Sequence, residues 1–192
     1  MTTEDTRDKI LRIAMRIFSK YGFQKTTMDE IAKTAHKAKG SVYYYFNSKE
    51  DLFRAVVQQE INEIKSGLTK VIIKQQDTPT MIKQYLLQRM VLMKNAVNYH
   101  ETVRADFSEK YEFLEDVREE FFRFETDLFK AILDKGVEEN KLEIRDTTAS
   151  ANVIIIAFKA IEIPFYLHKN IGQYDETITE LLDILIRGLE RG

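Results

Sequence analysis

Residues 26–53 read TTMDEIAKTAHKAKGSVYYYFNSKEDLF, and this segment contains several helix-end signals close together. Thr27 and Glu30 have the spacing of a capping box, in which each side chain bonds to the backbone at the other's position. Residues 47–51, NSKED, form a second capping sequence before a longer apolar segment. The sequence therefore predicts a short helix ending near Ala35, a tight turn, a second short helix over 40–45 and then a long helix.

The outward face of the second short helix follows from helical spacing. Val42 and Phe46 lie four residues apart and share one face, which their apolar character assigns to the core. The residues expected to point outward are Lys39, Gly40, Ser41, Tyr43 and Tyr44. A tyrosine ring can lie on a thymine methyl or donate to a phosphate, and a lysine can reach guanine or a phosphate. Taken singly, the tyrosines can also be core aromatics, the lysines solvated charges and Thr27 an ordinary cap.

The remainder of the chain is predicted to be all-α. Apolar residues recur at helical spacing almost everywhere, and strand-like alternation is nowhere sustained. A longer helix containing Ile10 to Tyr21 precedes the two short ones, which together make a helix-turn-helix arrangement. Further helices are expected at about 48–71, 78–98, 110–140, 147–168 and 175–189, with a connection around 100–108.

Composition restricts the classes of function. The chain has 192 residues and no cysteine, which excludes disulfides and thiolate sites and favours a cytoplasmic location. Residues 1–54 contain eleven bases and seven acids, which leaves 18 of the 29 bases and 24 of the 31 acids for the rest. The excess of bases in residues 1–54 and of acids in the rest of the chain suggests that only residues 1–54 contact a polyanion. A solvated face also produces such an imbalance.

The sequence contains no signal for a membrane span, a secretory leader, a metal site or a phosphate-binding loop. The longest uncharged stretch, 147–158, is too short to span a bilayer, and the mixed charges of residues 1–10 do not suit a secretory signal. The histidines at 36, 100 and 168 stand alone, and no glycine-rich phosphate loop is present. We therefore expect no enzyme, no metal, no cofactor and no membrane partner.

With these motifs identified, the N-terminal segment resembles the DNA-binding signature of the TetR family of bacterial transcription repressors. The resemblance covers residues 5–54 and includes AMRIFSKYGFQKTTMDEIA before the turn. It implies that Thr27, Tyr43 and Lys49 contact phosphates. It implies that the residues facing bases or nearby backbone are Lys39, Gly40, Ser41 and Tyr44. The family counterpart of Tyr45 is either at the DNA or packed beneath it.

The turn departs from the family pattern. Where the family usually shows Gly, an apolar residue and Ser, this chain has His36, Lys37 and Ala38. If the turn needs a left-handed residue, histidine adopts it less easily than glycine. Ala38 cannot cap the second helix with its side chain, a loss of roughly 1 kcal/mol relative to Ser. Lys37 adds a further candidate for a phosphate contact.

The resemblance divides the chain into a helix-turn-helix DNA-binding domain at 1–47 and a helical effector-binding and dimerisation domain at 48–192. An apolar stripe in the second domain is either ordinary core or the lining of an effector cavity, since flexible Met side chains suit an adaptable apolar ligand. Glu162 is either a rim residue or a polar anchor in that cavity. The candidate effector residues are Met81, Tyr85, Met90, Met93, Phe107, Phe121, Phe124 and Glu162.

The resemblance also implies a homodimer formed by the last two long helices. The candidate interface residues are Ile155, Phe158, Ile178, Leu181 and Leu185, each of which can instead belong to the intrachain core. The predicted function is a ligand-responsive, sequence-specific DNA-binding transcriptional regulator, a repressor that releases a pseudopalindromic operator on binding a small apolar effector. The alternative is a helical small-molecule-binding protein or enzyme with a vestigial DNA-binding motif. No residue decides between repressor and activator.

Overall fold

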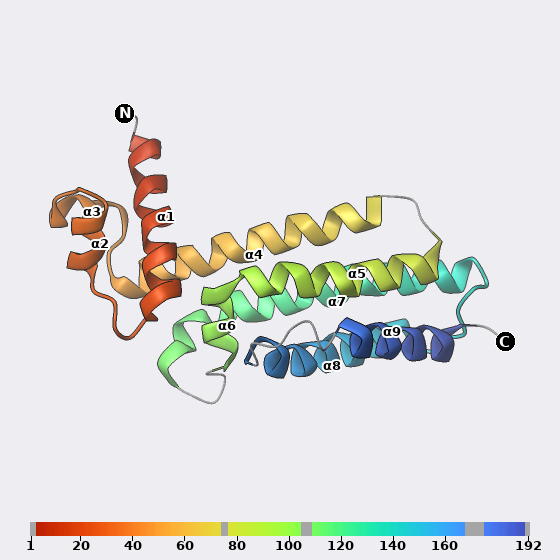
Figure 1. Cartoon of the computed structure of the whole chain (residues 1–192). Helices are drawn as coiled ribbons and strands as arrows, with labels where there is room; N and C mark the ends of the chain where they lie inside the picture. The colour runs from red at the N-terminus through yellow and green to blue at the C-terminus, as the bar shows by residue number, and fades with distance from the viewer. Residues whose placement is uncertain (1–2, 74–76, 105–108, 168–174, 191–192) are drawn as a thin grey trace. The chain divides into compact units, whose positions relative to one another are not determined.

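A computed structural model describes residues 3–73, 77–104, 109–167 and 175–190, and within these ranges it is helical with no strand. The elements are α1 (Thr3–Tyr21), α2 (Met28–Thr34), α3 (Lys39–Tyr45), α4 (Lys49–Ile73), α5 (Thr78–Asn95), α6 (Val97–Arg104), η1 (Glu109–Leu114), α7 (Glu115–Glu138), α8 (Thr147–Leu167) and α9 (Asp175–Leu189) (Figure 1). The all-α prediction is confirmed. Among the described residues no helix combines the length and the apolar character needed to cross a bilayer.

The chain forms two compact units, and each is built from two separate pieces of sequence. The N-terminal unit comprises residues 1–63 and 96–118, and the C-terminal unit comprises 64–95 and 119–192. The predicted DNA-binding domain lies within the first piece of the N-terminal unit. The predicted boundary at residue 47 stays a prediction.

The core of the N-terminal unit is aromatic. The rings of Phe18, Phe23 and Phe53 lie within 6.1 Å of one another, centroid to centroid, and all three are buried. Tyr111 and Phe113 of η1 add two more rings, at 5.8 and 5.6 Å from Phe23. Residues far apart in the sequence therefore share one core.

The connection between α1 and α2 is fixed at Phe23. Its backbone N–H donates to the Glu101 carboxylate at 3.1 Å, and its carbonyl accepts a hydrogen bond from Lys49 Nζ at 3.0 Å. Gly22 supplies the left-handed backbone, with φ of 81°, that lets the chain turn here. The Tyr111 hydroxyl donates to the same Glu101 carboxylate at 2.7 Å. Burial is the main reason that the pKa of Tyr111 is raised, and this hydrogen bond raises it further.

The start of α6 is capped by a side chain of α4. The buried Glu60 carboxylate accepts the backbone N–H of Tyr99 at 2.8 Å and the side-chain amide of Asn98 at 2.7 Å. Burial raises the pKa of Glu60, although these hydrogen bonds oppose the rise. The Asn98 amide also donates to Ser19 Oγ at 2.9 Å, so α6 is bonded to both α1 and α4.

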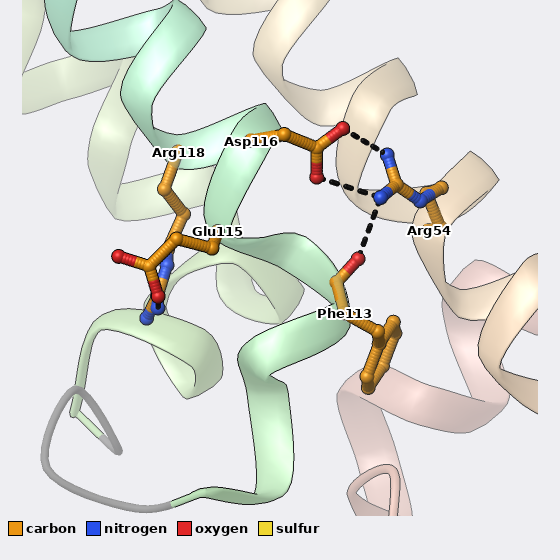
Figure 2. Close-up of polar contacts among 5 residues, drawn as sticks. All are labelled: Arg54, Phe113, Glu115, Asp116 and Arg118. Atoms are coloured by element: carbon orange, nitrogen blue, oxygen red, sulfur yellow. Dashed lines mark hydrogen bonds and ion pairs between the residues drawn. The ribbon is translucent and has the colours of Figure 1, made fainter.

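Arg54 joins α4 to the chain around η1 by three hydrogen bonds. Its two terminal nitrogens donate to the two carboxylate oxygens of Asp116, at 2.8 and 2.6 Å, and one also donates to the Phe113 carbonyl at 2.7 Å (Figure 2). This pairing holds the pKa of Asp116 below its usual value. Planar bidentate pairs of this kind fix orientation as well as distance.

Two segments differ from the sequence-based prediction. The predicted connection around 100–108 is helical as far as Arg104, and the single helix predicted for 110–140 begins as η1, with a non-helical Tyr111, before α7. The cap on α6 comes from Glu60, which lies 38 positions before its partner Asn98. The local sequence therefore contains no capping residue that would predict the start of α6.

The C-terminal unit contains a buried ion pair. Arg89 of α5 donates to Glu125 of α7 through Nε at 2.6 Å and through a terminal nitrogen at 3.2 Å, and the two side chains are only 1% and 3% exposed. Tyr85 packs on Phe129 beside it, with ring centroids 5.1 Å apart. Lys83 joins α5 to α9 through Asp183 at 2.6 Å.

Candidate nucleic-acid interface

The capping box predicted at the start of α2 is present. Thr27 Oγ1 accepts the backbone N–H of Glu30 at 3.3 Å, and the Glu30 carboxylate accepts the backbone N–H of Thr27 at 2.8 Å. Two backbone donors of the first turn are thereby satisfied, which fixes where α2 begins. Thr27 itself is exposed at this helix end.

The turn between α2 and α3 has the geometry expected of its unusual sequence. His36 adopts a left-handed conformation with φ of 53°, which costs a histidine more than a glycine. Ala38 stands at the N-cap of α3 without a side-chain hydrogen bond. The turn is closed instead by backbone bonds, from Lys37 N–H to the Ala32 carbonyl at 3.0 Å and from His36 N–H to Lys33 at 3.1 Å.

One face of α3 is exposed and aromatic. Val42 and Phe46 are fully buried, as their spacing predicted, whereas Tyr44 is 76% exposed and Tyr43 is 41% exposed. The alternative of buried core aromatics is therefore wrong for Tyr43 and Tyr44. Tyr45 is half-buried and meets Tyr44 edge to face, with ring centroids 5.0 Å apart.

The two small candidates of α3 differ in exposure, since Gly40 is exposed and Ser41 is half-buried. Apart from its two chain neighbours and the backbone of its own helix, no atom lies within 4 Å of the position where Gly40 would carry a Cβ, so a ligand can approach the backbone there. Ser41 is half-buried, and its backbone N–H donates to the Ala38 carbonyl at 2.9 Å.

The three candidate lysines all have partners inside the N-terminal unit. Lys39 Nζ lies 2.8 Å from the Asp29 carboxylate, and this hydrogen bond raises the pKa of Lys39. Lys37 reaches Thr6 Oγ1 at 3.4 Å. Lys49 bonds to the Phe23 carbonyl and stands 4.4 Å above the Phe23 ring. The sequence motif did not reveal these contacts because each partner is ten or more residues away.

A groove of about 380 Å³ lies between α1 and α2. Its lining includes apolar side chains from α1, two cations, and Glu30 of the capping box. The lining residues are Ile13, Arg16, Ile17, Lys20, Tyr21, Glu30 and Thr34. The sequence-based prediction did not include this groove, because it depends on how two helices pack.

The predicted effector residues of the C-terminal unit divide into three groups. Met81, Tyr85, Met93 and Phe121 are buried, and Met90 and Phe124 are half-buried. Phe107 and the side chain of Glu162 lie outside the described residues. Burial of this kind suits a core as well as a closed cavity, so the effector site stays a prediction. The sequence-based prediction missed the Arg89–Glu125 pair, which places two charges beside the same apolar residues.

The predicted dimer residues also divide. Ile155, Phe158 and Ile178 are buried within the single chain, so their environment is that of the intrachain core, which was the alternative for each. Leu181 and Leu185 are half-exposed. Among the described side chains of α8 and α9, the large hydrophobic ones that are exposed are Val153, Ile156 and Ile184, which the sequence-based prediction did not include.

Comparison with known proteins agrees with the geometry of α1 to α4. Residues 10–56 match the family model described as bacterial regulatory proteins, tetR family. The segment that forms α1 to α4 is therefore similar to the TetR family. The similarity of this chain to the HTH-type transcriptional regulator QacR of Staphylococcus aureus extends over 188 residues, at 26% identity, and covers 96% of this chain and 98% of QacR. The regulator AcrR of Shigella flexneri is 42% identical over 64 residues, which is 33% of this chain and 29% of AcrR.

Solved structures match the fold of this protein over nearly its whole length. A transcriptional regulator from Cytophaga hutchinsonii has a TM-score of 0.79 at 23% identity and covers 95% of this chain and 97% of its own. FadR from Bacillus subtilis, solved in complex with stearoyl-CoA, has a TM-score of 0.76 at 17% identity, with 94% and 98% covered. At these identities the likeness is one of fold.

Proposed function

We propose that this protein is a sequence-specific DNA-binding transcriptional regulator that acts as a repressor. The observation that carries the proposal is the exposed face of α3, where Tyr43 and Tyr44 stand above a fully buried Val42 and Phe46. A second helix of this kind enters the major groove and presents its outward side chains to base edges. The named relatives are transcriptional regulators, which favours regulation over catalysis.

The DNA contacts are proposed to follow the exposed surface of α2 and α3. Tyr44 is the residue expected to touch bases, because it is the most exposed aromatic of α3. Thr27 and Tyr43 offer hydroxyls to phosphates, and Gly40 lets the backbone come close. The proposed set also includes Lys37, Lys39, Ser41 and Lys49. Tyr45 packs edge to face against Tyr44 and supports its position.

A homodimer would present two copies of α3 to a two-fold symmetric operator. We propose that the exposed apolar residues of α8 and α9, together with Leu181 and Leu185, contribute to the contact between subunits. The proposed regulation is a population shift, in which an apolar effector binds the arrangement of subunits that fits DNA poorly. FadR of Bacillus subtilis in complex with stearoyl-CoA is a precedent for a ligand with a long acyl chain on this fold.

Selection of bound duplexes from a random pool tests the proposal. The expected winner is a two-fold symmetric sequence, and binding to it should saturate at two subunits or a multiple of two for each duplex. A pool that shows no enrichment after several rounds would contradict the proposal. A reporter gene placed behind the selected sequence should be silenced by the protein, whereas increased expression would make the protein an activator.

A further inference from the structure

The first residue of α3 already has an anionic partner on the surface proposed to face DNA. Lys39 Nζ lies 2.8 Å from Asp29 Oδ1, and the two side chains are 60% and 64% exposed. Asp29 is the second residue of α2, so the contact bridges the two helices of the motif. Lys37 and Lys49 differ from Lys39, since Lys37 bonds to the Thr6 hydroxyl and Lys49 to the Phe23 carbonyl.

The contribution of this ion pair to folding stability is too small to explain its presence. Ion pairs between exposed side chains contribute little to folding, because water screens the attraction and two long side chains lose freedom. The pair does change the charge that DNA meets. A carboxylate 2.8 Å from the ammonium cancels most of its attraction for a phosphate, and the carboxylate itself is repelled by the duplex.

We infer that Asp29 is a specificity-determining residue, which keeps Lys39 in an ion pair until an operator base offers acceptors in place of the carboxylate. The inference rests on the proposed function. On DNA of arbitrary sequence no guanine is aligned with the ammonium, and its partners are mainly phosphates. Leaving Asp29 then exchanges one anion for another and leaves the Asp29 carboxylate without a cation. At the operator, guanine O6 and N7 provide two aligned acceptors in the major groove. Asp29 therefore lowers binding to arbitrary DNA more than binding to the operator.

The test compares Asp29→Asn with Glu50→Gln. Glu50 is a matched control, because it is also the second residue of a helix, α4, it is exposed, and it forms no ion pair with any described residue. Both variants remove one negative charge and one favourable contact with a helix N-terminus. Only Asp29→Asn releases Lys39.

Affinity for a mixed-sequence duplex and for the selected operator is measured from 50 to 300 mM salt. Asp29→Asn should bind the mixed duplex about threefold to tenfold more tightly than Glu50→Gln does, with a salt slope steeper by about 0.9, because one more cation reaches a phosphate. Its operator affinity should rise less, so the specificity ratio falls. Lys39→Met should weaken mixed-duplex binding at least about threefold more in the Asp29→Asn background than in the wild type.

Each result has a defined meaning. Equal mixed-duplex affinities for Asp29→Asn and Glu50→Gln, or a gain that persists in the double variant with Lys39→Met, would overturn the inference. A protein that binds mixed DNA and responds to Asp29→Asn, yet selects no operator, would support the release of Lys39 and contradict the proposed function. A protein that binds no duplex even at 50 mM salt would overturn both.

Discussion

Phe23 shows how one residue in a loop can be fixed as firmly as one in a helix. Its N–H, its carbonyl and its ring each have a partner, namely Glu101, Lys49 and the aromatic core. The two polar partners are charged, and hydrogen bonds to charged groups are stronger than those between neutral groups. Lys49 therefore has a structural role at the start of α4 besides its proposed contact with phosphate.

Replacement of Lys49 should lower the stability of the N-terminal unit. Lys49→Met removes the charge-assisted bond to the Phe23 carbonyl, and we expect the free energy of unfolding to fall by about 1 kcal/mol. Urea denaturation followed by tyrosine fluorescence measures the change. Lys25→Met is the control, because Lys25 is exposed and forms no ion pair with a described residue. Equal stability of the two variants would contradict a structural role for Lys49.

Replacement of Tyr44 should leave the stability almost unchanged and reduce the sequence specificity of DNA binding. Because its side chain is 76% exposed, Tyr44→Ala is expected to change the free energy of unfolding by less than about 0.5 kcal/mol. The loss of its ring should reduce the ratio of operator affinity to mixed-sequence affinity by about tenfold, which corresponds to one base contact. Fluorescence anisotropy with the two duplexes measures the ratio. An unchanged ratio would remove Tyr44 from the proposed contacts.

At the scale of elements, α2 and α6 show what the sequence could and could not predict. The start of α2 was predictable because Thr27 and Glu30, which cap it, are both within its first turn. The helix α6 was not, because its capping carboxylate belongs to Glu60 of α4. The outward face of α3 followed from periodicity, whereas the partners of Lys39 and Lys49 depended on tertiary packing.

The cap on α6 should make stability depend on pH. Burial raises the pKa of Glu60 above 4.5, so the folded protein binds a proton that the unfolded chain releases. Stability contributed by this group is therefore greatest at acid pH and falls as pH rises through the folded pKa. The free energy of unfolding of the wild type, minus that of Glu60→Gln, should increase as the pH is lowered from 7 to 5. A difference that stays constant or decreases would show that the carboxylate is not destabilised by burial.

At the scale of the whole molecule, the N-terminal unit is assembled from two pieces of sequence. The second piece, residues 96–118, supplies Glu101, Tyr111 and the partners of Glu60. A family motif that ends near residue 54 therefore does not define a folding unit. The sequence-based domain boundary rested on that motif, and the contacts made by residues 96–118 depend on tertiary structure.

A fragment of residues 1–63 should consequently be unstable alone. Without α6 and η1 it leaves the Glu60 carboxylate without its hydrogen-bond donors and exposes one side of the aromatic core. We expect its thermal transition, measured by circular dichroism, to be broad and to lie below that of the full chain. Addition of a separate peptide of residues 96–118 should raise the midpoint. A fragment 1–63 that melts as sharply and at the same temperature as the full chain would contradict the assignment of 96–118 to this unit.

The bond from the Phe23 amide to Glu101 has a spectroscopic consequence. Loop amides normally exchange their hydrogen with solvent quickly, but this one is donated to a carboxylate 78 positions later in the chain. Its deuterium uptake is therefore a single-residue reporter of whether the two pieces of the unit remain joined. An effector or an operator that loosens their association would be detected at this amide even if every helix stayed intact.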